Sequence, residues 1–326
     1  MKPRGLLVLG AAALAVAAVL AWSSVRTDRA FRRLLVDGER AAADRQVAEA
    51  IEAYSGALAL RPDSMVAHLR RGDMYRRQGA NELALRDLRD ASALDPTAPQ
   101  PAELLGDVNL AMGRLEGAVD AYHRALALDD RAPRAQYKLG LALYRANRVP
   151  DAVRSLAKAL ALDDSLAEAH YLLGVCLREQ RRPQDGLREL RRAVALNPGL
   201  VPAREALAEV FRAAGRRREH IEQLEAIAAL EPDEPRRLIS IADAYAKSGR
   251  ADTALATIDR LSDPLPDEPG VRAEVARVWL AAAQSGRTVN FALLARAERL
   301  LSPLAASANA TGHVLALLGQ VQRLRG

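Results

Sequence analysis

Residues 99–132 read PQPAELLGDVNLAMGRLEGAVDAYHRALALDDRA, and residues 133–166 repeat the pattern as PRAQYKLGLALYRANRVPDAVRSLAKALALDDSL. This 34-residue pattern occurs seven times, from Phe31 to Glu268, without an insertion or deletion. Self-similarity at a fixed period of this length indicates a solenoid, in which each repeat packs on its neighbours. The sequence therefore predicts a repeat architecture.

Each repeat, called a block below, has the pattern of two amphipathic helices joined by a turn. Large apolar residues stand at helical spacing, as Leu139, Leu143 and Leu156 do in block four. Place 8 of each block is always small, and place 20 is small except for His220 in block six. We expect these two columns to meet across each hairpin, because small side chains let helices approach closely. Blocks one to seven begin at Phe31, Met65, Pro99, Pro133, Ala167, Val201 and Pro235.

The pattern resembles the tetratricopeptide repeat family, on Leu105-Gly106, Ala118, Tyr122 and Ala125 in block three and on equivalent residues elsewhere. The resemblance implies an all-α fold, a right-handed superhelical solenoid of antiparallel helix hairpins. It also implies a function in binding proteins or peptides. The chain departs from the family in having no Trp at place 4 and only 4% aromatic residues, which predicts a core rich in alanine and leucine.

The sequence divides into segments of distinct character. We expect a degenerate eighth repeat over residues 269–311, with a lengthened turn from Ser285 to Asn290. We expect residues 312–326 to form a half-repeat capping helix, because polar residues stand between its apolar ones. The remaining segments are a basic tail at 1–4, a hydrophobic helix at 5–25, a linker at 26–30 and the seven repeats at 31–268.

The segment from Gly5 to Val25 contains 21 residues and no charge. As a helix it would be roughly 31 Å long, against about 30 Å for the hydrocarbon core of a bilayer. We expect a single-pass anchor in a bacterial cytoplasmic membrane, although a secretory signal cleaved after Ala21 also fits. Basic residues flank both ends, so the side of the membrane stays open, with a preference for repeats outside the cytoplasm.

The sequence contains no motif that indicates catalysis. It has no glycine-rich phosphate loop, no paired cysteine motif and no His-Glu-x-x-His. His68 and His170 share place 4 of their blocks, where we expect structural roles, and Cys176 has no neighbouring cysteine. We therefore predict neither an enzyme nor a cofactor or metal site.

In blocks three to seven one arginine recurs every 34 residues, in the turn inside the hairpin. This basic edge could contact anionic lipid, polysaccharide or nucleic acid, or it could simply be a solvated turn typical of the family. We favour the solvated turn and do not expect nucleic acid, since the turns between blocks are acidic and no aromatic residues alternate with the arginines. The basic edge consists of Arg114, Arg148, Arg182, Arg216 and Arg250.

The resemblance implies that the first helices of the hairpins line a concave wall, mainly through places 2, 5, 6, 9, 12 and 13. These places are charged in blocks two and three, but in blocks four and five they are largely apolar and tyrosine-bearing. Such a strip, with basic residues around it, suits an extended or helical acidic peptide. The alternative is that its residues only pack against neighbouring helices. The strip consists of Tyr137, Lys138, Leu141, Tyr144, Tyr171, Leu172, Val175 and Arg178.

These features predict a membrane-anchored scaffold that binds protein or peptide partners on its concave face. The resemblance places such scaffolds in the assembly of envelope, secretion, pilus or polysaccharide complexes. Two alternatives stay open: a cleaved, soluble periplasmic adaptor, and a regulatory subunit of a separately encoded enzyme. The sequence leaves the partner and the oligomeric state undetermined.

Overall fold

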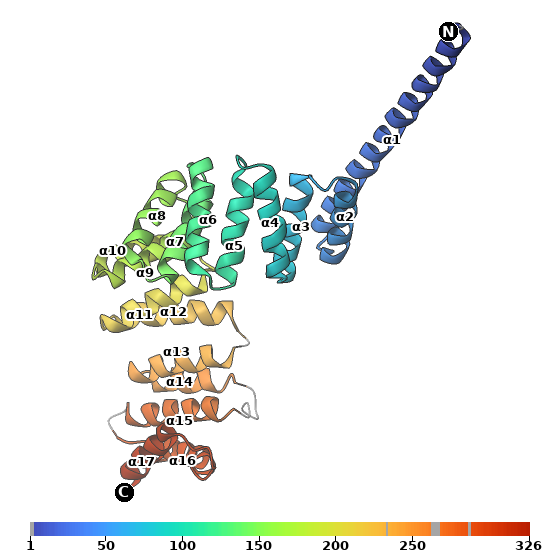
Figure 1. Cartoon of the computed structure of the whole chain (residues 1–326). Helices are drawn as coiled ribbons and strands as arrows, with labels where there is room; N and C mark the ends of the chain where they lie inside the picture. Colours follow the sequence, from blue (N-terminus) through green and yellow to red (C-terminus); the bar gives the residue numbers. More distant parts are fainter. Residues whose placement is uncertain (1–2, 233, 262–267, 286–287) are drawn as a thin grey trace. The chain divides into compact units, whose positions relative to one another are not determined.

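The computed structural model describes residues 3–232, 234–261, 268–285 and 288–326, with the backbone alone for residues 3–21. In these ranges the chain has 17 α-helices and no strand (Figure 1). The helices pair as consecutive hairpins, which confirms the predicted all-helical solenoid. The chain forms two compact units, residues 1–164 and 165–326.

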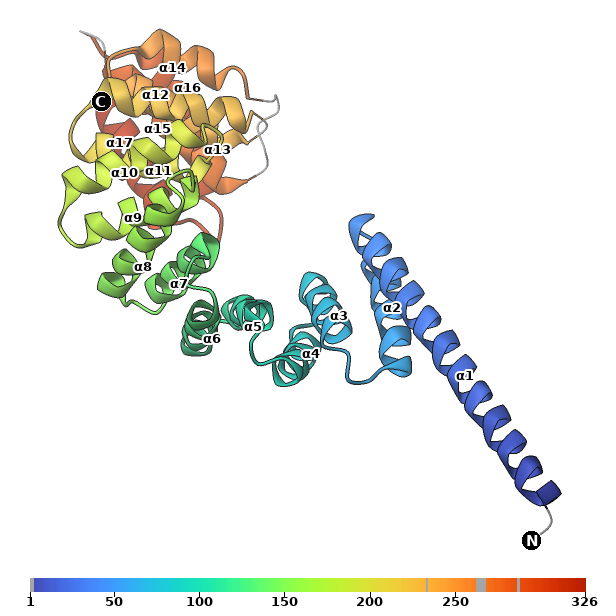
Figure 2. The ribbon, with the colours of Figure 1, turned by 90° about the horizontal axis from the view of Figure 1, so that it is seen from above.

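The first unit contains four hairpins that follow one another in sequence order (Figure 2). Within each hairpin the two helices pack together, and each hairpin packs on the next. The helices are α1 (Pro3–Ala43), α2 (Val47–Leu60), α3 (Met65–Gln78), α4 (Asn81–Leu94), α5 (Pro99–Ala111), α6 (Leu115–Leu128), α7 (Pro133–Arg145) and α8 (Val149–Leu162).

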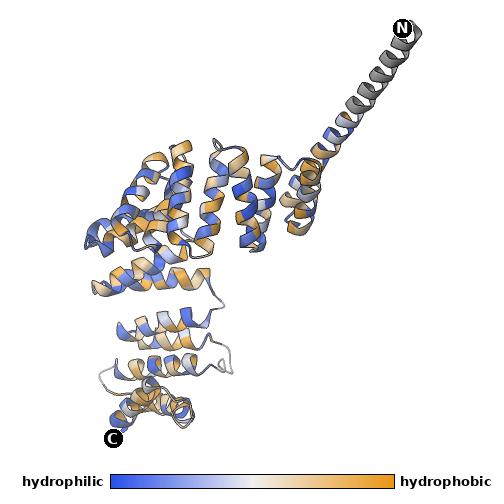
Figure 3. Ribbon diagram, in the orientation of Figure 1, coloured by the Kyte–Doolittle hydropathy of each residue, from blue (hydrophilic) through white to orange (hydrophobic). Residues whose placement is uncertain are grey.

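The second unit contains four further hairpins and a final helix. Apolar and polar residues alternate along its helices, as Figure 3 shows for both units. The helices are α9 (Ala167–Glu179), α10 (Pro183–Leu196), α11 (Val201–Ala213), α12 (Arg217–Leu230), α13 (Pro235–Lys247), α14 (Ala251–Ile258), α15 (Pro269–Gln284), α16 (Phe291–Ala305) and α17 (Gly312–Arg325). Residues 286–287 of the expected long turn, and residues 262–267 at the end of block seven, lie outside the described residues.

Small residues at place 8 allow a large side chain of the second helix to lie directly on the first. A Cβ added at Gly106 would lie 2.5 Å from the Tyr122 ring, and one added at Gly174 would lie 2.8 Å from Leu190 and 3.0 Å from the Gly186 carbonyl oxygen. Place 8 thus meets place 24 in each hairpin that has glycine at place 8. It also meets place 20 in blocks four and five, since a Cβ at Gly140 would lie 3.5 Å from the Ala152 carbonyl oxygen. The two helices of a hairpin pack closely because place 8 has a small residue, and this close packing leaves no room for a larger one.

Helix α1 runs without a break through residues 26–30, so the linker predicted there from the sequence is wrong. No Gly or Pro interrupts this stretch, and Asp28 pairs with Arg32 at 2.8 Å one helical turn away and with Arg61 of the turn after α2. No helix with described side chains is both long and apolar enough to cross a bilayer. Most of the expected hydrophobic segment at 5–25 lies outside those residues.

Candidate functional site

In five hairpins the first helix carries an acid at place 9, and the acids of blocks two, three, six and seven each bind a base. In block two, Asp73 accepts ion pairs from Arg76 at 2.7 Å and from Arg77 at 2.9 Å. In block six, Glu209 pairs with Arg212 at 2.6 Å. We call these four acids the acid row: Asp73, Asp107, Glu209 and Asp243.

The acid of block three has the most buried partners. The Tyr122 hydroxyl donates to Asp107 at 2.7 Å, and the Lys138 ammonium lies 2.9 Å from Asp107 and 2.7 Å from Glu103. Burial and the negative charge of Asp107 raise the pKa of Tyr122. Burial disfavours the charge on Lys138, but its hydrogen bonds to Glu103 and Asp107 outweigh burial and raise its pKa. Lys138, which the sequence places in the binding strip, is therefore already neutralised by α5.

Block seven repeats this arrangement in the second unit. Asp243 lies 2.7 Å from Lys247 on its own helix and 2.5 Å from Arg277 on α15. The acid of α13 is thus held from both its own helix and the next first helix. The charges at place 9 are balanced internally wherever the acid row is present.

Helix α7 breaks this pattern, because its place 9 is Leu141. Tyr137, Leu141 and Tyr144 are spaced at i, i+4 and i+7, so they share one helix face, and all three are partly exposed. We call these three residues the α7 strip. Arg134 and Arg145 at its two ends are exposed and form no ion pair in the part of the chain that the structure describes. The α7 strip is therefore an apolar surface between two uncompensated positive charges.

The other half of the expected strip belongs to the second unit, on α9. There Leu172 is only 4% exposed, so it is a core residue and not a contact residue. Tyr171 packs against the cluster of Leu187, Leu190, Leu207 and Phe211, and burial raises its pKa, as does the charge of Glu205. A Cβ at Gly186 would lie 2.7 Å from the stem of Arg178, so that side chain packs on α10. Tyr171, Leu172 and Arg178 thus pack within the second unit, and the continuity of the strip from α7 to α9 stays a prediction.

The arginines of the basic edge occupy the position just before the second helix of hairpins three to seven. An acid near the start of such a helix is favoured by the helix dipole, and here it binds the arginine as well. Arg148 pairs with Asp151 at 3.0 Å and Arg182 with Asp185 at 2.7 Å. Arg216 pairs with Glu219 in the same way, Arg114 pairs with Glu82 of the preceding hairpin at 2.9 Å, and Arg250 stacks on Tyr245 at 4.5 Å. Four of the five arginines of the edge are therefore each paired with a nearby acid.

A set of contacts between places 4 and 23 was not foreseen from the sequence. His68 lies 3.1 Å from Asp87, His170 lies 2.7 Å from Glu189, and Arg204 lies 3.2 Å from Gln223, each pair 19 residues apart. The signal was present, since a polar residue at place 4 is matched by a polar residue at place 23 in these blocks. These residues replace the large apolar side chain that the family pattern puts at place 4.

Three donor atoms of His68, Asp87 and Asp90 lie close enough together to hold a metal ion. However, Arg71 binds both carboxylate oxygens of Asp87, at 2.7 and 2.8 Å, and the second ring nitrogen of His68 bonds to the Pro62 carbonyl at 3.0 Å. The guanidinium already supplies the positive charge that Asp87 needs. The cluster therefore fits a structural ion pair and not a cation site.

Cys176 is fully buried, and burial raises the pKa of its thiol to about 12. A thiol with such a pKa is almost entirely protonated at neutral pH, so it is a poor nucleophile. The thiol is therefore suited to a place in the core of the second unit.

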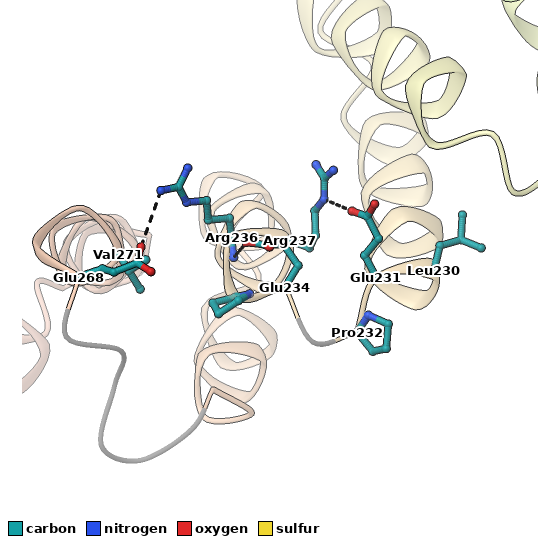
Figure 4. A pocket seen from close by; sticks show the side chains of 9 residues that line it. Leu230, Glu231, Pro232, Glu234, Arg236, Arg237, Glu268 and Val271 are labelled. Atoms are coloured by element: carbon teal, nitrogen blue, oxygen red, sulfur yellow. Dashed lines mark hydrogen bonds and ion pairs between the residues drawn. The ribbon is translucent and has the colours of Figure 1, made fainter. Parts of the chain in front are cut away.

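A cavity of about 890 Å³ lies beside the first turn of α13 (Figure 4). Its lining is charged, but the charges pair with one another. Arg237 lies 2.5 Å from Glu231 and 2.7 Å from Glu205, and Arg236 lies 3.8 Å from Glu268. The cavity offers a ligand little uncompensated charge.

Comparisons with known proteins agree with this fold. Models described as "TPR repeat" and "Tetratricopeptide repeat" match residues 106–147, and residues 35–99 and 146–201. No curated protein matches the sequence. Among solved structures, PilF of Pseudomonas aeruginosa has a TM-score of 0.55 at 20% identity, over 65% of this chain and 95% of that one.

Two further structures are similar over about half of the chain. MamA of Desulfovibrio magneticus has a TM-score of 0.46 at 22% identity, over 52% of this chain and 96% of that one. YrrB, described as a TPR protein with an unusual peptide-binding site, has a TM-score of 0.47 at 20% identity, over 53% of this chain and 89% of that one. The likeness to PilF shows a shared fold. The repeat models match tetratricopeptide repeats within residues 35–99 and 106–201.

Proposed function

We propose that this chain is a scaffold that binds an acidic segment of a protein partner on the first helices of its first unit, with the α7 strip at the centre. One observation carries the proposal. Charges at place 9 are neutralised internally on α3 and α5, whereas α7 offers an apolar, tyrosine-bearing face between Arg134 and Arg145. Tyrosine combines a large apolar area with a polar tip, which is why it is frequent at binding surfaces.

The chemistry of the partner follows from this surface. Apolar side chains of the bound segment would contact Tyr137, Leu141 and Tyr144, and its carboxylates would pair with Arg134 and Arg145. An extended or helical segment fits, because the surface runs along the first helices, which contact one another from α3 to α5 and from α5 to α7. Tyr171, Val175 and Arg178 of α9 lie in the second unit, where they would provide a contact surface of their own for a partner.

The place of action is a second part of the proposal. The uncharged segment at 5–25 would tether the repeats to a bacterial cytoplasmic membrane, where the scaffold would take part in an envelope, secretion, pilus or polysaccharide complex. A soluble adaptor released after Ala21 and a regulatory subunit of a separate enzyme are the competing arrangements. Carbonate extraction of cell membranes separates the tethered form, which stays in the pellet, from the released form, which does not.

Site-directed photo-crosslinking of the full chain in cells tests the binding surface. p-Benzoylphenylalanine replaces Tyr144, and at a matched control position it replaces Arg124, which is exposed on α6. We expect a discrete crosslinked protein from position 144 and none from position 124. We further expect the crosslink to weaken when Arg134 and Arg145 are both changed to Glu. Equal crosslinking from both positions, or none from position 144, would refute the proposal.

A further inference from the structure

The sixth hairpin is the one that departs from the small-residue rule at place 20. At this place Ala50, Ala84, Ala118, Ala152 and Ala254 are all fully buried between their two helices. Block six instead has His220, which is only partly buried. Its Nδ1 lies 2.9 Å from the carbonyl oxygen of Ala208, so Nδ1–H donates to the backbone of α11. A whole imidazole thus reaches the first helix where other hairpins have a methyl group or no side chain.

The neighbouring hairpin in the same unit shows what this change does to packing. In hairpin five a Cβ at Gly186 would lie 2.7 Å from the carbonyl oxygen of Gly174, so the two backbones touch at places 8 and 20. In hairpin six the His220 ring stands between the corresponding positions of α11 and α12. The helices cannot approach as closely, because the ring occupies the volume of the missing contact.

A cavity of about 530 Å³ lies beside this ring, between the turn of hairpin six and helix α13. That volume is within the range of small-ligand and side-chain pockets. Its apolar lining comes from Phe211, Ile221 and Ala244, and its basic lining comes from Arg212, Arg217 and Lys247. The cavity therefore combines an apolar floor with a cationic rim.

The charges around the cavity do not cancel. Its one acidic residue, Asp243, is shared by Lys247 and Arg277, and Arg212 is bound by Glu209. Arg217 is exposed and forms no ion pair with any described residue. An excess of positive charge therefore stays at the rim, with Arg217 as the group available to an anion.

The orientation of His220 further restricts the kind of ligand that the cavity can bind. Because Nδ1 donates to Ala208, the neutral ring carries its lone pair on Nε2, which has no hydrogen-bond partner among the described residues. Nε2 can accept a hydrogen bond from an amide N–H. An acidic residue within a peptide offers both a carboxylate and a neighbouring amide N–H, whereas a free organic acid offers only the carboxylate.

We propose that this cavity binds an acidic residue of a peptide. The carboxylate pairs with Arg217, a backbone N–H donates to His220 Nε2, and an adjacent apolar side chain contacts Ile221 and Ala244. The site is independent of the proposed function, because all its residues lie in the second unit and none lies on α7. The two can fail separately.

The test uses the full chain and the probe acetyl-Leu-Asp-Leu-amide, titrated by calorimetry and by the NMR signals of the five histidine rings. The His220 signal is assigned by its absence in His220→Ala, and it should shift on binding. The matched probe acetyl-Leu-Asn-Leu-amide, which lacks the charge, should bind about tenfold more weakly. Isobutyrate, which has the carboxylate and an apolar body but no amide, should bind more weakly than the Asp peptide.

Three variants complete the experiment. Arg217→Ala should lower the affinity for the Asp peptide about tenfold. The neighbouring Arg218→Ala should have no effect, because Arg218 pairs with Glu222 and does not line the cavity. His220→Ala restores the repeat pattern, so it should abolish binding without lowering the stability of the array. The proposal would be overturned if either Arg217→Ala or His220→Ala bound the Asp peptide with wild-type affinity. It would also be overturned if the Asn peptide or isobutyrate bound as tightly as the Asp peptide, or if the wild-type chain did not bind the Asp peptide at about 10 mM.

Discussion

Helices α5 and α7 are neighbouring first helices built on the same 34-residue pattern, yet they present opposite chemistry at places 5 and 9. Helix α5 has Glu103 and Asp107, which are bound by Lys138 and, for Asp107, by Tyr122. Helix α7 has Tyr137 and Leu141, which lie between exposed arginines. The comparison teaches that the repeat fixes the backbone, while a few places decide whether the charges on a helix face are neutralised by neighbouring residues.

The largest expected effect follows from removing the acid of α5. Asp107→Ala leaves the fully buried Tyr122 hydroxyl without its acceptor and takes one of two acids from Lys138, so we expect a loss of about 3 kcal/mol. Leu141→Ala, at the same place of α7, should cost only about 1 kcal/mol because its side chain is partly exposed. Urea unfolding, with hydrogen exchange to localise the opening, measures both. Equal costs would mean that the two faces are not different in kind.

The second effect is on binding. Arg134→Glu together with Arg145→Glu should lower the affinity for an acidic peptide about tenfold at low salt. The difference in affinity should shrink as salt screens the charges. The control is Arg124→Glu with Arg154→Glu, which changes the net charge equally on the exposed surface of α6 and α8. If the control pair weakens binding as much, the attraction is due to net charge and not to the ends of the α7 strip.

A smaller effect depends on alkaline pH. The pKa of Tyr122 is raised in the folded chain, so its contribution to stability is present below the unfolded value near 10 and is lost as the pH rises above it. We expect hairpin three to open more readily between pH 10 and 11 than at pH 9. Because burial also raises the pKa values of Tyr54 and Tyr245, the measurement is the difference between wild type and Tyr122→Phe. An identical pH dependence in both would exclude the Tyr122–Asp107 bond as its source.

The sequence predicted the hairpins well, because helix periodicity and small residues at fixed places are local signals. Gly106 under Tyr122 and Gly174 under Leu190 are direct consequences of that pattern. The grouping of Tyr137, Leu141 and Tyr144 on one helix face also followed from spacing alone. These features require no knowledge of the neighbouring repeats.

The surroundings of other residues depend on partners that are distant in the sequence. The acids that bind Lys138 are Glu103 and Asp107 of α5, which lie 35 and 31 residues away. The sequence around Lys138 therefore does not reveal that its charge is neutralised. Leu172 was assigned to the surface by its place number, but it is buried. The basic edge was read from arginines alone, although an acid such as Asp151 or Asp185 stands three residues after two of them. Whether such a residue is free to bind a partner depends on its contacts within and between repeats, and not on its residue type.

The most direct test of the account is the affinity of the full chain for acidic, apolar peptides selected from a random library, measured in a His220→Ala background that removes the cavity beside His220 as a second binding site. The double variant Tyr137→Ala, Tyr144→Ala should keep its circular dichroism spectrum and bind the selected peptides at least about tenfold more weakly. The control Leu83→Ala, Leu128→Ala, which removes exposed apolar side chains from α4 and α6, should bind them like the wild type. Undiminished binding by the tyrosine variant, or selection of basic instead of acidic peptides, would contradict the account.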